Sequence, residues 1–474
     1  MRGGRLWTVG VMLGTVALLA ACGGGGPTQI PAGTSHITLT IQYTPPAGAT
    51  VLAFQASITG ATLNPVETGG VSTALPPVSV LNSPVEVELT QLATYSTLLT
   101  ESAVPEGSYS GITLTFGTAR LTFQNNSGSA VGSCPNGAIC QVNPTISPAT
   151  LTLNSQPTFP IPLYANTPGG LQINFNLAQP LQGDLSTVNP TITASQLSVS
   201  QGPQGSLGVG QMNNLEGLVT GADNTSLKFA LSTGLYPLTI LTDNTTQYDG
   251  FAEQGLKDNF TGLQVGQVVR SQAILHADGT LSATVVGLQQ TTAEAKTAQL
   301  KGTITSVDSG TQFHMVVRDE LQQVNGILIG DLVNVTLQGA PTFSIASDGL
   351  TVPPVFSFAS ASDLMVGQEV QITVASGSSG TDVSTDQITL RMADLTATVN
   401  VVNDTSTITV GNLPPLFTSA GISTIRLGVV PETQYNSVPA LTAGQTLAAH
   451  GLLFKFTDTP IMITQTIGPQ IFSY

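Results

Sequence analysis

The sequence has few charged side chains, and basic ones are the scarcest. Only 8% of its 474 residues are charged, whereas about 25% is usual for a soluble domain. Lys and Arg number 12 against 27 Asp and Glu, which gives a formal net charge of −15. A chain with this few basic residues is poorly suited to neutralising a run of phosphates. We therefore predict that the protein does not bind nucleic acid. The low charge and the 41% hydrophobic content also argue against intrinsic disorder.

The scarcity of Glu, Lys and Arg also removes the commonest formers of exposed helices. Instead, apolar and polar residues alternate along short segments separated by Gly, Pro and Asn, which is typical of strands packed on one face. Examples are Ile37–Tyr43, Val85–Leu89, Ile112–Phe116 and Leu171–Leu177. We therefore predict an all-β fold that begins with a β-sandwich over residues 36–200, with Thr and Ser on its solvent faces. A helix around Leu89–Leu99 is the main expected exception.

The first 21 residues have the pattern of an export signal. Arg2 and Arg5 precede an apolar stretch, Leu6–Leu19, that is too short to span a bilayer. It ends at Leu19-Ala20-Ala21-Cys22, which resembles the lipobox of bacterial lipoproteins. The resemblance implies cleavage before Cys22, a thioether-linked diacylglycerol on its sulfur and acylation of the new N-terminus. The alternative is an ordinary secretory signal with a chance cysteine.

Residues 22–35 are predicted to form a Gly-rich tether, because four glycines and Pro27 follow Cys22. The residue after Cys22 is Gly23 and not aspartate, which by resemblance to the lipoprotein sorting rule of Gram-negative bacteria favours the outer membrane. We therefore expect a cell-envelope protein whose partner is the membrane, through the lipid on Cys22. Several acyl chains, at about 0.8 kcal/mol per buried methylene, would anchor it stably.

The sequence contains three cysteines, of which Cys22 is assigned to the lipid. Cys134 and Cys140 enclose a short segment of turn residues, and an isolated pair so close together outside the cytoplasm favours a disulfide. A metal clamp and a redox dithiol are the alternatives. Neither fits well, because no histidine lies nearby and the spacing is not C-x-x-C.

Residues 36–195 resemble an uncharacterised domain common in bacterial lipoproteins. The resemblance rests on the spacing of an opening strand after the tether, Val87-Glu-Leu89, Pro105–Ile112, the late strand Leu171–Leu177 and the closing Pro190-Thr-Ile192. It implies a β-sandwich-like fold and an envelope location, with no assigned activity.

The second half of the chain contains an internal repeat of three related motifs. These are Leu263-Gln-Val-Gly266-Gln-Val-Val269, Leu364-Met-Val-Gly367-Gln-Glu-Val370 and Leu441-Thr-Ala-Gly444-Gln-Thr-Leu447. The pattern resembles a second uncharacterised bacterial domain with an oligonucleotide-binding-fold-like barrel, a name that describes shape and not function. After a linker at residues 201–214, we predict three small β-barrels in tandem over residues 215–292, 299–396 and 397–474.

No catalytic, cofactor or metal motif is recognisable, so we predict no catalytic residues, no bound metal and no cofactor. The four histidines, His36, His276, His314 and His450, lie in different units and are interpreted as structural or surface residues. Arg120 could bind an anion, although pairing with a Glu or capping a strand edge is the simpler interpretation. Glu86 and Glu88 are two residues apart on one strand and are expected on one exposed face.

Clusters of Asp, Asn and Thr between strands offer the oxygen ligands that calcium prefers. Asp243 and Asp249 loosely resemble a calcium loop, and Asp223-Asn-Thr225 and Asn403-Asp-Thr405 have similar composition. The spacing does not match an EF-hand, and Asn and Asp are ordinary turn residues. We therefore interpret these clusters as turns.

Two functions are compatible with these features. The first is a non-catalytic, lipid-anchored envelope protein that acts as a structural or interaction scaffold for envelope proteins. The alternative is a surface protein that binds glycans or another neutral polymer. Sugar-binding faces usually present aromatic platforms, yet Trp7 lies in the signal and aromatics are 5% of the chain. Phe116, Phe123 and Phe175 fall on the inward alternation and are expected in the core.

Overall fold

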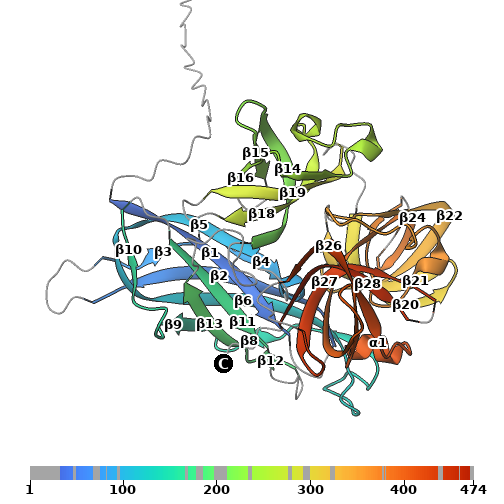
Figure 1. The fold of residues 1–474 in the computed structure, drawn as a ribbon. Helices are drawn as coiled ribbons and strands as arrows, with labels where there is room; N and C mark the ends of the chain where they lie inside the picture. The colour runs from blue at the N-terminus through green and yellow to red at the C-terminus, as the bar shows by residue number, and fades with distance from the viewer. Residues whose placement is uncertain are drawn as a thin grey trace, which may run out of the picture.

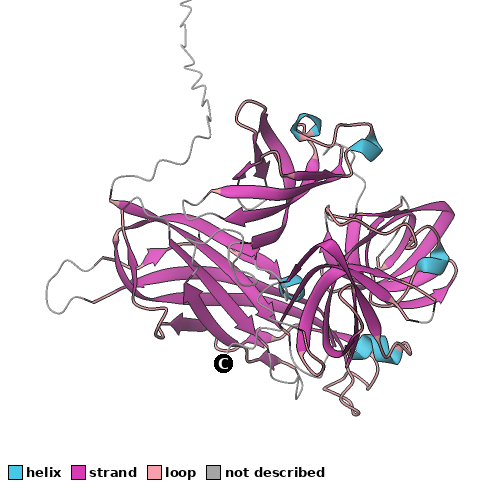
Figure 2. Cartoon of the chain, viewed as in Figure 1, coloured by secondary structure: helices cyan, strands magenta, loops and turns pink. Residues whose placement is uncertain are grey.

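A computed structural model shows a β protein built from one sandwich and three barrels (Figures 1 and 2). The structure describes residues 33–45, 50–67, 75–81, 83–92, 97–165, 169–177, 185–196, 211–232, 237–275, 280–291, 299–320, 326–375, 378, 380–435, 441–457 and 459–469. The predicted signal, Cys22, and most of the tether and of the linker lie outside these residues, and β1 already begins at Thr34 within the predicted tether. Within them, strands dominate and helices are short, which confirms the all-β prediction.

The sandwich consists of two facing sheets. One has the order β13-β11-β1-β5, with β1 at Thr34–Thr44, β5 at Thr97–Pro105, β11 at Gly169–Asn176 and β13 at Thr191–Gln196. The other is built on the long antiparallel pair of β2 (Thr50–Pro65) and β6 (Gly107–Gln124). Its shorter strands are β3 (Val78–Ser79), β4 (Val85–Glu88), β7 (Ile139–Val142), β8 (Thr145–Ile146), β9 (Thr150–Leu153), β10 (Ile161–Leu163) and β12 (Thr187–Val188).

Side-chain alternation explains the core of the sandwich. The apolar residues of β1 from Ile37 to Tyr43 are buried between the sheets. Phe116, Phe123 and Phe175 are buried in the same core, as expected from their position on the inward face. Because one face of each strand is apolar, burying it removes the most apolar surface from water and fixes the register.

The opposite face of β1 differs from the prediction. Thr38, Thr40 and Gln42 were expected to face solvent, but they are 2%, 1% and 6% exposed. The first barrel lies against this sheet, and Leu98 of β5 packs into that barrel's apolar core. Part of the Thr-rich surface is therefore a covered surface between modules, which alternation within one strand does not reveal.

The region around Leu89–Leu99 also differs from the prediction. A single 3-10 turn, η1 (Leu89–Leu92), replaces the expected helix, and β5 begins at Thr97. The predicted disulfide is present: Cys134 is bonded to Cys140, which lies in β7.

Each barrel has five main strands that pair in the same way. The first strand pairs with the second and the fourth, and the second strand pairs with the third. The fifth strand pairs with the third and the fourth. The third and fifth strands are parallel and the other pairs are antiparallel, which closes a Greek-key barrel of the oligonucleotide-binding-fold type. In the first barrel these strands are β14 (Gln211–Asp223), β15 (Lys228–Ser232), β16 (Pro237–Leu241), β18 (Val268–Leu275) and β19 (Leu281–Gln290). The short β17 (Gln247–Asp249) pairs with β19.

The second and third barrels share one strand. β24 (Asp382–Val402) closes the second barrel with its first half and opens the third with its second half, so the predicted boundary at 396/397 falls inside it. The second barrel also contains β20 (Gln299–Ser309), β21 (Gln312–Glu320), β22 (Leu332–Ile345) and β23 (Glu369–Thr373). The third contains β25 (Thr407–Gly411), the helix α1 (Pro415–Ser419), β26 (Ile425–Tyr435), β27 (Thr446–Phe454) and β28 (Ile461–Pro469).

The repeated motif forms the same turn before the fourth strand of every barrel. Its glycine, at 266, 367 or 444, has φ between 85° and 95°, where a side chain is disfavoured. The next residue is glutamine, whose Oε1 accepts a hydrogen bond from the backbone N–H three residues earlier, at 2.7, 2.8 and 3.2 Å. The repeat is therefore explained by the geometry of this turn.

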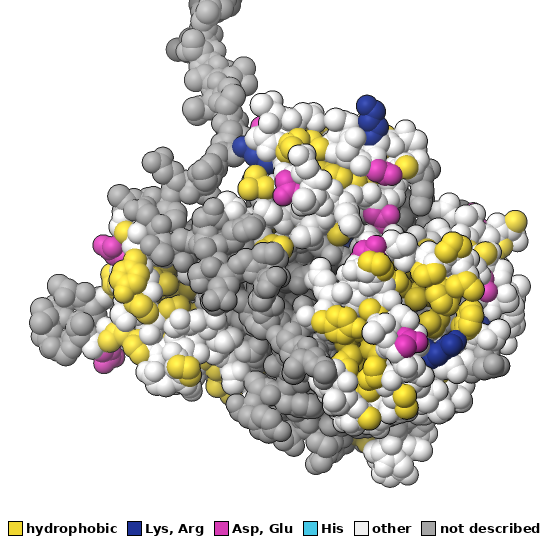
Figure 3. Space-filling view, in the orientation of Figure 1, with side chains coloured by type: hydrophobic (Ala, Val, Ile, Leu, Met, Phe, Trp, Pro, Cys, Tyr) yellow, Lys and Arg dark blue, Asp and Glu magenta, His cyan; other side chains and the backbone are white. Residues whose placement is uncertain are grey.

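Few charged atoms lie on the face seen in Figure 3. Over the described part of the chain, no helix is both long and apolar enough to cross a membrane.

Candidate functional site

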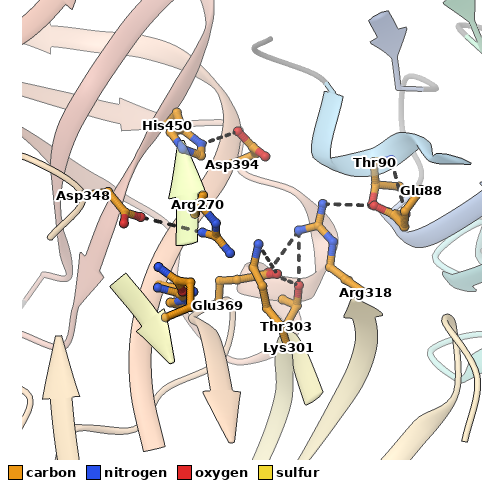
Figure 4. Close-up of polar contacts among 12 residues, drawn as sticks. Glu88, Thr90, Arg270, Lys301, Thr303, Arg318, Asp348, Glu369, Asp394 and His450 are labelled. Carbon is orange, nitrogen blue, oxygen red and sulfur yellow. Dashed lines mark hydrogen bonds and ion pairs between the residues drawn. The ribbon is translucent and has the colours of Figure 1, made fainter. Parts of the chain in front are cut away.

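A buried group of charged residues lies where the sandwich meets the barrels (Figure 4). At its centre is Arg318 on β21, whose guanidinium lies 3.1 Å from Oε2 of Glu369 and 3.8 Å from Oε2 of Glu88. Glu369 begins β23 of the same barrel, whereas Glu88 ends β4 of the sandwich. Arg318 therefore links two modules through two carboxylates.

Glu88 is held in place by groups of the sandwich itself. Its Oε1 accepts hydrogen bonds from the backbone N–H of Phe54 at 2.8 Å and from the hydroxyl of Thr90 at 2.7 Å. Burial raises the pKa of Glu88, and the Arg318 charge and these hydrogen bonds partly offset that effect. The Glu88 side chain is 7% exposed, which corrects the expectation of an exposed face shared with Glu86. Only Glu86 is exposed, because the second barrel covers the Glu88 end of the strand.

The group extends from Glu369 toward the first barrel. Lys301 on β20 lies 3.9 Å from Oε1 of Glu369, and Arg270 on β18 lies 3.7 Å from Oδ2 of Asp348. Burial and the neighbouring Arg270 charge lower the pKa of Lys301 to about 8, although Glu369 acts in the opposite direction. Arg391 on β24 donates a hydrogen bond to Gln289 of the first barrel.

Four of the twelve basic residues of the chain thus gather in this junction: Arg270, Lys301, Arg318 and Arg391, each at most 7% exposed. Burying a charge costs several kcal/mol unless it is paired and hydrogen-bonded. Carboxylates provide that compensation for Arg270, Lys301 and Arg318, and the Gln289 amide oxygen provides a hydrogen bond for Arg391. We call these residues, with Glu88, Asp348 and Glu369, the junction cluster.

Other contacts fasten the same modules. Arg120 of β6 pairs with Asp331 of the second barrel at 2.5 Å, so its partner is a carboxylate but an aspartate of another module instead of the expected glutamate. Thr122 donates to the carbonyl of Gly330 at 2.6 Å. Asp249 of the first barrel accepts hydrogen bonds from the second barrel, from the hydroxyl of Ser347 at 3.0 Å and the N–H of Asp348 at 2.7 Å.

The clusters considered for calcium are turns in the structure. The carboxylates of Asp223, Asp243 and Asp404 each accept hydrogen bonds from backbone N–H groups two residues later, at 2.9, 2.7 and 2.7 Å. Hydrogen bonds from the hydroxyls of Ser226, Thr245 and Ser406 to the same carboxylates, followed by these backbone ones, lower the pKa of all three carboxyls. Asp249 does not join Asp243 in a loop, because its carboxylate accepts hydrogen bonds from Ser347 and Asp348 of the second barrel. No grouping of three or more potential metal ligands occurs among the residues that the structure describes.

The two histidines whose side chains the structure describes lie in different barrels and have different partners. His450 on β27 pairs through Nδ1 with Asp394 on β24 at 2.8 Å, inside the third barrel's wall. His314 lies near Asp308 at 2.9 Å beside a hairpin turn. His276 and the side chain of His36 fall outside the described residues.

A cavity of about 430 Å³ lies beside the junction cluster. It is bounded by Tyr43 and Thr50 of the sandwich, by Arg318 and Glu369 of the second barrel and by the third barrel from Ala393 to Thr398. The loop before α1 and the first residues of α1 complete it, and the backbone N–H of Leu416 in α1 donates to the Thr50 hydroxyl at 3.2 Å.

Sequence reasoning did not single out the junction cluster. The available signal was a charge inside an apolar strand of a nearly uncharged chain, as at Arg318 after Met315-Val-Val and at Arg391 after Leu390. That signal shows that a charge is buried, but it does not identify the partner, since Glu88 lies 230 residues before Arg318.

Comparisons with known proteins yield little. No known protein family and no curated protein matches the chain. One solved structure that matches is a multidomain protein with nucleic acid binding domains from Streptococcus pneumoniae. It is 12% identical, covers 53% of this chain and 72% of its own, and superposes with a TM-score of 0.11.

That match opposes our prediction that the protein does not bind nucleic acid, and we withdraw the exclusion. The physical reason is that a charge count over the whole chain does not describe the charge of any one local surface. At this TM-score the likeness carries no argument for nucleic-acid binding by this chain.

Proposed function

We propose that this chain is a lipid-anchored protein of the cell envelope, in the outer membrane of a Gram-negative bacterium, and that it acts as a rigid interaction scaffold without catalysis of its own. The membrane half of the proposal rests on the lipobox at Leu19–Cys22 and on Gly23 after it. The disulfide between Cys134 and Cys140 is consistent with an oxidising compartment.

The observation that carries the scaffold half is the junction cluster. Modules that need only be linked in series could be joined by flexible linkers, which cost nothing to desolvate. Here Arg318 is instead buried between carboxylates of two modules, and β24 is common to two barrels. Buried ion pairs fix one geometry, because a shifted arrangement leaves a charge unpaired. A fixed spatial arrangement of modules is what a scaffold requires.

Replacing the lipid-bearing cysteine tests the anchor. We expect the wild-type protein to fractionate with outer membranes and to carry acyl chains by intact mass spectrometry. When an ordinary cleavable secretory signal replaces residues 1–21, Cys22→Ser should be released in soluble form, because a tether without acyl chains offers no apolar surface to the bilayer. Retention of the variant in the membrane fraction, or an unacylated wild-type mass, would refute the anchor.

Calorimetric unfolding of the soluble Cys22→Ser protein tests the scaffold. We expect one cooperative transition for the coupled modules. Arg318→Met should lower the unfolding free energy by about 3–5 kcal/mol, because it leaves buried Glu88 without its cation and leaves Glu369 with Lys301 alone. Glu88→Gln, which keeps the side-chain shape, should act in the same direction with a smaller effect.

Lys257→Met, at an exposed lysine of the first barrel, is the matched control and should leave the transition unchanged. Independent transitions in the parent protein, or an Arg318→Met variant as stable as the control, would argue against coupled modules. A reproducible hydrolase or redox activity of the purified protein would contradict a purely scaffolding role.

A further inference from the structure

The cavity beside the junction cluster has the size of a ligand site. Its volume of about 430 Å³ falls within the range of about 300–1,000 Å³ that small-molecule pockets occupy. It is assembled from segments that lie far apart in the sequence, including Tyr43, Thr90, Thr303 and Thr446. Only the fixed arrangement of sandwich and barrels creates it.

Tyr43 supplies an unused hydrogen-bonding group at this cavity. Its side chain is 1% exposed and packs edge-on against Phe54, with ring centroids 6.3 Å apart. Its hydroxyl has no hydrogen-bond partner within the described part of the chain. Buried hydroxyls are normally paired, since an unpaired one loses its hydration without compensation. Burial raises the pKa of Tyr43 well above its ordinary value, so the hydroxyl stays protonated and can donate.

The charged residues that line the cavity already have partners within the protein. Arg318 lies 3.1 Å from Glu369, and Asp394 lies 2.8 Å from Nδ1 of His450. A charged ligand would therefore have to compete with these partners instead of meeting a free counter-charge. The electrostatics favour an uncharged ligand that exchanges hydrogen bonds.

One wall is polar and another is apolar. Asp394, Thr396 and Thr398 alternate along β24 and line the cavity from the third barrel, and Asn412 donates to the Thr398 hydroxyl at 3.4 Å. Apolar contacts come from the segment Leu413–Phe417 around α1. A sugar ring has this combination of features, because its hydroxyls lie around the edge and its C–H groups form an apolar face.

We propose that this cavity binds one or two units of an uncharged saccharide, with the Tyr43 hydroxyl as a hydrogen-bond donor to the sugar and the Thr398 hydroxyl as its partner on the opposite wall. This goes beyond the scaffold, which needs no ligand. The saccharide would sit between sandwich and third barrel and contact both.

The test is isothermal titration calorimetry of the soluble Cys22→Ser protein with a panel of uncharged hexoses, N-acetylhexosamines and their disaccharides. We expect saturable heat with at least one of them. Tyr43→Phe removes one oxygen that has no described protein partner, and Thr398→Val replaces a hydroxyl with a methyl group of similar size. Each should weaken the binding of that sugar about fivefold to tenfold.

Tyr248→Phe is the matched control. Tyr248 lies in the first barrel, away from the cavity, and also packs edge-on against a phenylalanine, Phe251. Removing the Tyr248 hydroxyl should leave the affinity for the sugar unchanged. No heat with any uncharged sugar would overturn the proposal. Equal affinity in wild type and both cavity variants would do the same, as would tighter binding of the corresponding uronic acid.

Discussion

At the scale of single residues, the most informative feature is the buried charge. The chain is only 8% charged, yet four of its twelve basic residues are buried in one internal junction. Lys301 is the least well compensated of the four, because its ammonium is 3.9 Å from Glu369 and is close enough to Arg270 to be repelled by it. Its charge therefore makes the folded state less stable at neutral pH than it would be with a neutral side chain.

Lys301 makes a prediction about pH. Its pKa is about 8 in the folded protein against an ordinary value of 10.5, so the unfolded chain binds more protons between these values and stability rises with pH across that window. This contribution is lost again as the pH falls through about 8. The difference between these two pKa values corresponds to about 3 kcal/mol.

Chemical denaturation at pH 7.5, 8.5 and 9.5 should show that rise in the parent protein and a flatter profile in Lys301→Met. Lys257→Met should retain the parent profile. The interpretation fails if Lys301→Met keeps the full pH dependence or if the parent protein loses stability over this interval.

At the scale of elements, the alternation of single strands was predictable and their partners were not. The apolar face of β1 and the buried phenylalanines of β6 and β11 follow directly from side chains that point to opposite faces. The burial of Thr38 and Thr40 on the other face depends on the first barrel, which the local pattern does not report. The expected helix near Leu89 failed for the same reason, since η1 packs against β1 and β2 and then gives way to β5.

The repeated turn shows how one element can acquire a second role. Gly266 and Gly444 have open space where a Cβ would be, so only their positive φ requires glycine. Gly367 has the same φ, but a Cβ there would come within 2.2 Å of the Phe417 ring. Phe417 belongs to α1, so the turn of the second barrel also forms the surface against which a helix of the third barrel packs.

The three glycines form a natural series for mutation. We expect Gly444→Ala to cost about 1 kcal/mol of unfolding free energy, because alanine must adopt a left-handed conformation. Gly367→Ala should cost at least about 2 kcal/mol, since the Phe417 ring must also move. Urea denaturation measures both, with Gly266→Ala as a second control. Equal losses of unfolding free energy at all three positions would mean that Phe417 does not pack against the turn at Gly367.

At the scale of the whole molecule, the sequence predicted one sandwich and three barrels but not how they fit together. Fold class follows from patterns within tens of residues, and the repeated turn marks each barrel. The junction depends on contacts such as Glu88 with Arg318 and Arg120 with Asp331, whose partners lie more than 200 residues apart. A shared strand such as β24 is likewise invisible to a division of the chain into consecutive units.

The central claim is that these contacts hold the modules in one arrangement, and a distance measurement between modules tests it most directly. Spin labels at Ser155→Cys in the sandwich and Thr405→Cys in the third barrel, both exposed positions, report that distance by pulsed electron paramagnetic resonance in the Cys22→Ser protein. We predict a single narrow distribution that becomes broad when Arg318→Met is added and stays narrow with Lys257→Met. A broad distribution in the protein with Arg318 intact would contradict the account.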